Sequence, residues 1–178
     1  CGRKTILMSR ALSEGDTWIG QVVTPDALID EGAVVTVGDE IVWVGQADRV
    51  PDELQVVPVA QIPEGSMILP GLVDVHCHGG GGASFPDAES MEDVEVAANE
   101  HLKHGTTTLI ASLVTAPVDV LEERAALLAD ATEKGIVAGV HYEGPFLSQA
   151  RCGAQDPRYL IPATPDVARR LVDAARGT

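Results

Sequence analysis

The alternation of predicted strands and helices from about residue 66 onward constrains the fold of this chain more than any other feature. Apolar, β-branched runs over 72–78, 106–113 and 136–141 predict three strands, and each is followed by a segment with helical periodicity. Strands that alternate with helices form parallel sheets through right-handed crossovers, and such strands are buried on both faces. We therefore expect three consecutive βα units.

The starts of the helices carry residues with known capping preferences. Ser90 and Asp93 have the spacing of a capping box at the start of a helix expected over about 90–104. Further helices are expected over about 117–134, with a proline near the first position, and over about 164–177. Capping residues and apolar stripes together support all three helices.

The number of βα units limits the architecture. A closed (β/α)₈ barrel needs eight units and typically about 250 residues. This chain has 178 residues and shows three such units. The sequence therefore predicts an α/β fold with a partial (β/α)₈ TIM-type barrel, the first part of a larger enzyme.

Residues 17–61 follow a different pattern. They contain β-rich runs at 34–37, 41–44 and 55–59, and no helical period runs through them. We expect a small antiparallel sheet here. The change of pattern places one domain at 1–65 and a second at 66–178.

The composition excludes several classes of function. The formal net charge of −15 repels phosphate backbones, which argues against nucleic-acid binding. No apolar run approaches the roughly 20 residues needed to span a bilayer. Arg3-Lys4 is followed by too short an apolar stretch for a signal peptide. Three cysteines, an odd number, fit a reducing compartment, so we expect a cytoplasmic protein without a membrane partner.

Histidines and a glutamate stand at the ends of two predicted strands. His76 and His78 share one face of an extended strand because they are two residues apart, and His141 and Glu143 do the same on the third strand. The carboxyl ends of parallel strands carry the active sites of such folds. Two imidazoles and a carboxylate suit Zn²⁺ or Fe²⁺, and a bound cation that lowers the pKa of water to about 7 suits hydrolysis.

Each of these residues also has a purely structural explanation. Buried histidines can be satisfied by backbone carbonyls, Glu143 could form a salt bridge, and His141 could be a hydrogen-bonded wall of a pocket. The glycines at 79–82 could cradle a phosphate or form a plain flexible loop. Cys77 points to the opposite face from the histidines, so we expect it in the core.

Four motifs indicate a family. They are Leu69-Pro-Gly-Leu-Val-Asp-Val-His-Cys-His, His104-Gly-Thr-Thr-Thr, His141-Tyr-Glu-Gly-Pro-Phe-Leu-Ser and Gly153-Ala-Gln-Asp-Pro. The first resembles the opening strand of the amidohydrolase superfamily, and the other three resemble its N-acetylglucosamine-6-phosphate deacetylase family. The resemblance covers residues 66 to about 165. It fits the N-terminal sheet only in outline, as the small β-sandwich domain of that family.

The resemblance implies metal-dependent hydrolysis of the acetamide of N-acetylglucosamine 6-phosphate, which gives glucosamine 6-phosphate and acetate in amino-sugar metabolism. It implies one or two divalent ions per site, with Zn²⁺ first and Fe²⁺ or another divalent ion as alternatives. Glu143 would be the principal ligand, and His76 and His78 would serve a second metal position. Substrate contacts are expected from His141, Ala154 and Gln155.

The resemblance also implies what lies elsewhere. The aspartate that acts as general base, two further histidine ligands and most of the phosphate-binding residues belong to later strands, so no catalytic residue is expected in this chain. We expect the 178-residue chain by itself to be inactive and the full-length protein to be a homodimer.

One position departs from the family pattern. Gln155 stands where the family has a histidine, and glutamine cannot carry a proton. Two alternatives remain open, namely another N-acyl amidohydrolase, such as an N-acyl amino acid deacylase, and an inactive fragment that serves as an interaction module.

Overall fold

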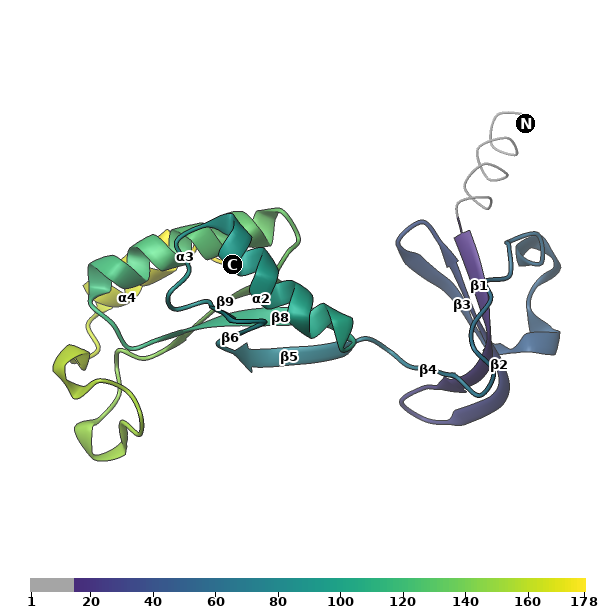
Figure 1. Cartoon of the computed structure of the whole chain (residues 1–178), viewed down its shortest axis with the longest axis horizontal. Coiled ribbons are helices and arrows are strands. Elements are labelled where there is room, and N and C mark those ends of the chain that lie inside the picture. The colour runs from purple at the N-terminus through teal and green to yellow at the C-terminus, as the bar shows by residue number, and fades with distance from the viewer. Residues whose placement is uncertain (1–14) are drawn as a thin grey trace. The chain divides into compact units, whose positions relative to one another are not determined.

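The computed structural model describes residues 15–178 and divides into two compact units, of which the first ends at Pro70 and the second runs from Gly71 to Thr178 (Figure 1). The interpretation of the N-terminal segment as lacking a signal peptide lies outside the described residues. The domain limits of 1–65 and 66–178 stay a prediction. In the described part of the chain, no helix is long and apolar enough to cross a membrane.

The first unit contains a four-stranded sheet with the order β3-β2-β1-β4. Its strands are β1 (Gly15–Val23), β2 (Leu28–Val37), β3 (Glu40–Gln46) and β4 (Met67–Ile68). β2 pairs antiparallel with β1 and β3, whereas β4 pairs parallel with β1. The predicted strands at 34–37 and 41–44 are parts of β2 and β3. Gly38, with φ of 61°, provides the left-handed residue that the tight turn between them requires.

Two expectations for this unit differ from the structure. Over the described residues the unit forms one sheet, so the β-sandwich is not confirmed. The predicted strand at 55–59 is wrong, because these residues form a turn in which only Val59 makes an isolated bridge to Thr17. Pro58 has no N–H group to donate to a neighbouring strand. The side chain of Val57 is buried, at 2% exposed, although it does not lie in a strand.

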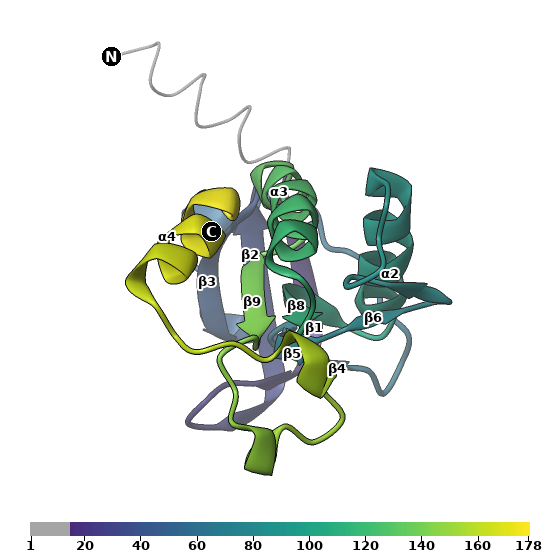
Figure 2. The same ribbon diagram turned by 90° about the vertical axis from the view of Figure 1, so that its left-hand side faces the viewer.

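The second unit has a three-stranded parallel sheet with the order β5-β8-β9. Its elements are β5 (Leu72–Cys77), α2 (Met91–Lys103), β8 (Thr106–Val114), α3 (Val118–Glu133), β9 (Gly139–Glu143) and α4 (Pro165–Ala174). Figures 1 and 2 show the three helices on the same side of this sheet. Three consecutive βα units and a mixed α/β fold are therefore confirmed, and three strands form an open sheet rather than a closed barrel.

Shorter elements complete the chain. A two-residue hairpin, β6 (Gly79–Gly80) with β7 (Ala83–Ser84), occupies the predicted glycine loop. The 3₁₀ helices are η1 (Ala47–Arg49), η2 (Asp52–Leu54), η3 (Gln149–Arg151) and η4 (Pro157–Tyr159).

The predicted helix starts are confirmed by their hydrogen bonds. The Ser90 hydroxyl accepts from the Asp93 N–H, and the Asp93 carboxylate accepts from the Ser90 N–H, which is the reciprocal pattern of a capping box. The Thr164 hydroxyl accepts from the N–H of Val167 at the start of α4. Both caps satisfy amide groups that have no partner inside the helix.

The third strand begins later than predicted. We expected it at residue 136, but β9 starts at Gly139. Gly135 has φ of 72° and donates to the Thr132 carbonyl, while Ile136 donates to the Ala131 carbonyl, so both residues complete a Schellman motif at the end of α3. The apolar character of this stretch therefore reflects packing at a helix end.

The core of the second unit lies between the helices and one face of the sheet. Its fully buried large side chains include Phe85, Val94, Leu113, Leu121 and Leu128. The expectation that all three strands are buried on both faces is wrong for β5. Leu72, Val73 and Val75 are 57%, 64% and 65% exposed, because among the described residues β5 is at the edge of the sheet with β8 as its one paired neighbour.

Candidate metal centre

The three ligands predicted in this chain converge at the carboxyl ends of β5 and β9. The Nε2 atoms of His76 and His78 lie 3.1 Å apart, and the Glu143 Oε2 atom lies 3.0 Å and 2.9 Å from them. All three ligand atoms are thus within bonding distance of one shared position. The β5–β8–β9 order makes this possible, because parallel strands end at the same edge of the sheet.

The hydrogen bonds around His78 determine which ring nitrogen is free. His78 Nδ1 lies 3.1 Å from the Ser112 carbonyl, which can only accept, so Nδ1 carries the proton. In a neutral ring, Nε2 then has a lone pair that faces the Glu143 carboxylate. Lone pairs that face one another at these distances require an added proton or a cation between them.

Ser112 connects the strands below this centre and is fully buried in β8. Its hydroxyl accepts from the Cys77 N–H at 3.2 Å and pairs with His141 Nδ1 at 2.9 Å. Its carbonyl holds His78. One residue therefore fixes parts of both neighbouring strands. Sequence reasoning missed Ser112, although a serine within the otherwise apolar second half of the strand, residues 109–114, was a usable signal.

The electrostatics of Glu143 reflect the same convergence. The hydrogen bond with His76 holds the pKa of the Glu143 carboxyl below its usual value, and the charge of His78 acts in the same direction. A hydrogen bond from Gln155 adds to this effect, while partial desolvation opposes it. The carboxylate is thus ionised at neutral pH, which is the form that binds cations.

The predicted substrate residues are divided between two places. Ala154 and Gln155 line a cavity of about 430 Å³ that reaches His78 and Glu143. The Gln155 Oε1 atom accepts from the Thr115 N–H at 2.6 Å. His141 is not among the residues that line this cavity. Its ring centroid lies 5.0 Å from that of His76, and its Nδ1 atom pairs with the Ser112 hydroxyl.

Gly144 follows the glutamate in a conformation suited to glycine. Its φ is 111°, and a Cβ atom placed on it would collide with the Thr115 hydroxyl. This close approach lets the chain turn at the end of β9 while Glu143 still faces the histidines.

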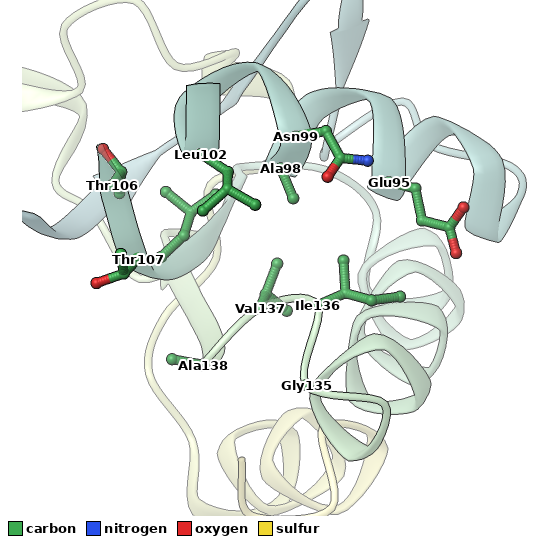
Figure 3. Close-up of a pocket in the computed structure, with 11 residues that line it drawn as sticks. Glu95, Ala98, Asn99, Leu102, Thr106, Thr107, Gly135, Ile136, Val137 and Ala138 are labelled. Atoms are coloured by element: carbon green, nitrogen blue, oxygen red, sulfur yellow. The ribbon is translucent and has the colours of Figure 1, made fainter. Parts of the chain in front are cut away.

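A larger cavity of about 630 Å³ lies at the opposite end of the strands (Figure 3). It is bounded by α2, the start of β8 and the loop before β9, and Glu95 is its one ionisable lining residue. Parallel α/β folds carry their catalytic groups at the carboxyl ends of the strands. The smaller cavity beside Glu143 is therefore the candidate active site.

The sequence of this chain matches a known protein family. The sequence profile of the amidohydrolase family matches residues 67–175, which is more than half of the chain. The chain belongs to the amidohydrolase family.

Individual relatives are more specific. The chain is 30% identical over 162 residues to N-acetylglucosamine-6-phosphate deacetylase from Bacillus subtilis, which covers 85% of this chain and 40% of that protein. It is similar to the crystal structure of N-acetyl-D-glucosamine-6-phosphate deacetylase from Mycobacterium smegmatis, with a TM-score of 0.79 and 35% identity over 92% of this chain and 45% of that one. A mutant of that enzyme, solved in complex with N-acetyl-D-glucosamine-6-phosphate, gives a TM-score of 0.76 at 35% identity, over 92% of this chain and 41% of that one. The chain spans less than half the length of each of these proteins.

Proposed function

We propose that this chain is the N-terminal portion of a metal-dependent deacetylase that hydrolyses N-acetylglucosamine 6-phosphate to glucosamine 6-phosphate and acetate. The observation that carries the proposal is the convergence of His76, His78 and Glu143 on one position, beside a cavity that Gln155 lines. Similarity to two deacetylase structures over 92% of the chain supports the choice of reaction.

The donor set fits a divalent cation. Two imidazole nitrogens and an ionised carboxylate are typical ligands of catalytic Zn²⁺, and Fe²⁺ or another divalent ion is compatible with the same set. Glu143 would be the principal ligand and the two histidines would complete the binding of one or two ions. When bound, the ion supplies Lewis acidity, which polarises a carbonyl group and lowers the pKa of water.

The residues of this chain would orient the reactants. Ser112 holds His78 so that Nε2 faces the metal position. Because the Gln155 carbonyl oxygen is occupied by the Thr115 N–H, its amide NH₂ group is left to donate towards Glu143 or the acetamide of the substrate. Glutamine can hold a substrate oxygen but cannot transfer a proton. The general base, an aspartate, would come from a later strand.

The rest of the proposal concerns the whole protein. The two units would be a small β-domain at 1–65 and the first three units of a (β/α)₈ barrel at 66–178. We infer that the full-length protein is a cytoplasmic homodimer and that it binds an amino-sugar phosphate as its small-molecule substrate. The 178-residue chain alone should release no acetate, because the remaining ligands and the general base are expected on later strands.

Metal binding by Glu143→Gln tests the centre directly. The amide lacks the negative charge that attracts the cation, so Zn²⁺ affinity measured by calorimetry should fall at least about tenfold. Glu92→Gln, on an exposed position of α2, is the matched control and should bind Zn²⁺ as the unaltered chain does. Equal Zn²⁺ affinity in all three proteins would remove the basis of the proposal.

The reaction is tested in the full-length protein that contains this chain. Acetate release from N-acetylglucosamine 6-phosphate should stop when a chelator removes the metal and return when Zn²⁺ is added. N-acetylgalactosamine 6-phosphate should be assayed in parallel, because an N-acetylgalactosamine-6-phosphate deacetylase from Shewanella is 29% identical over 105 residues, which is 58% of this chain. Failure to release acetate from either sugar would favour the inactive interaction module.

A further inference from the structure

A second group of metal-ligand side chains lies on the opposite face of the same strand end. The Cys77 Sγ atom is 3.1 Å from His101 Nε2, and the Asp74 carboxylate lies within 4.8 Å of both atoms. We propose that Asp74, Cys77 and His101 form a separate binding site for a thiophilic divalent ion such as Zn²⁺. This inference does not rest on the proposed deacetylase activity.

An irregularity in β5 creates the cluster. In a regular strand, residues three apart point to opposite faces. The pairing of β5 with β8 shifts between Asp74, which is opposite Leu109, and Cys77, which is opposite Ala111. Between these two pairs β5 therefore contains one residue more than β8. The extra residue brings the Asp74 and Cys77 side chains together, while His76 and His78 remain on the other face.

The third donor comes from α2, which packs against the β6 hairpin strand (Figure 2). His101 Nε2 also lies 3.0 Å from the Gly79 carbonyl. One N–H on Nε2 cannot point straight at both the carbonyl and the thiol. A Cβ on Gly80 would be 2.9 Å from His101 Nε2, so the absence of a side chain at Gly80 leaves room for the imidazole.

The charge, the burial and the 3.1 Å distance between Cys77 Sγ and His101 Nε2 fit a cation, and the Asp74 carboxylate lies within 4.8 Å of both atoms. Ligand atoms on one Zn²⁺ ion lie roughly 3 to 4 Å apart, given metal–ligand bonds of about 2.0–2.3 Å. The Asp74 carboxylate and a Cys77 thiolate together neutralise a divalent charge, which matters because Cys77 is only 5% exposed. The three side chains leave a fourth coordination position for water or the Gly79 carbonyl.

Co²⁺ binding to the metal-free chain tests the site, since thiolate ligation gives a near-ultraviolet charge-transfer band that His and Glu ligands do not give. The test uses a Cys1→Ser/Cys152→Ser background, in which Cys77 is the one cysteine left in the sequence. This protein should show the band at one equivalent of Co²⁺ and lose it when Zn²⁺ is added. Cys77→Ala in the same background should abolish the band.

Two milder variants separate a binding site from a chance contact. His101→Gln and Asp74→Asn should each weaken Co²⁺ binding at this band by more than about tenfold, with an unchanged circular dichroism spectrum. Glu143→Gln should leave the band unchanged and so separate this site from the candidate active site. Absence of the band in the background protein, or unchanged affinity in both milder variants, would overturn the proposal.

Discussion

At the scale of single residues, the candidate active site depends on a few hydrogen bonds between neighbouring strands. Ser112 makes three of them, to Cys77, His78 and His141. Buried polar groups cost free energy when they lose a partner, so this position has consequences for both stability and metal binding.

Ser112→Ala should destabilise the chain. The substitution leaves the Cys77 N–H without its acceptor and removes the partner of His141, which we expect to cost about 1 to 3 kcal/mol. Urea unfolding measures this change. Ser148→Ala, at an exposed residue with no side-chain capping bond, should stay within about 0.5 kcal/mol of the unaltered chain. Similar effects for both variants would contradict the role of Ser112.

Tyr142 should lose its phenolic proton only at an unusually high pH. Its hydroxyl donates to the Leu171 carbonyl at 2.7 Å, and burial, reinforced by the charge of Glu122, raises the pKa of Tyr142 to about 12. The unfolded value is about 10, so the neutral form stabilises the fold below pH 10 and this contribution is lost as the pH rises from 10 towards 12. Ultraviolet absorbance should show a phenolate transition near pH 12 that is absent from Tyr142→Phe. If all tyrosine side chains were ionised once the pH had passed about 10, the raised pKa of Tyr142 would be refuted.

At the scale of elements, the helices of the second unit are specified locally. Ser90 and Asp93 exchange hydrogen bonds at the start of α2, and a glycine in the left-handed region ends α3. Both signals can be read from the sequence, because capping involves residues only a few positions apart.

Ser90→Ala should lower the free energy of unfolding by about 1 kcal/mol, since the Asp93 N–H loses its acceptor and the capping box is broken. Thermal unfolding followed at a helix-sensitive wavelength measures it. Ser148→Ala again serves as the control, because Ser148 occupies the corresponding position before η3 without a capping bond. A loss no larger than that of the control would show that this capping box does not stabilise α2.

At the scale of the whole molecule, the open sheet leaves apolar surface on β5. Leu72, Val73 and Val75 are all more than half exposed, and β5 has one unpaired edge in the part of the chain that the structure describes. Exposed apolar strand edges promote association between chains.

The 178-residue chain should therefore self-associate as its concentration rises, and Val75→Lys should reduce this association by placing a charge on the strand. Sedimentation velocity over a concentration series measures it. Val172→Lys is the matched control, because Val172 is similarly exposed, at 56%, but lies on helix α4. Equal association in the two variants would show that the strand is not the contact.

The sequence by itself determined the local features of this protein. The βα alternation and the helix caps depend on residues close together in the chain, so periodicity and capping rules predicted them. The two-residue spacing of His76 and His78 likewise predicted that both imidazoles lie on one face of the strand. The resemblance of four motifs indicated the amidohydrolase family, and the match over residues 67–175 confirms it.

Only the tertiary structure decided how distant residues meet. Glu143 reaches His76 across 67 positions of sequence because β5, β8 and β9 lie side by side in one parallel sheet. The start of β9, the exposure of β5 and the shift that turns Asp74 towards Cys77 also depend on strand pairing. Pairing is set by the combined packing of sheet and helices, and no short stretch of sequence contains that information.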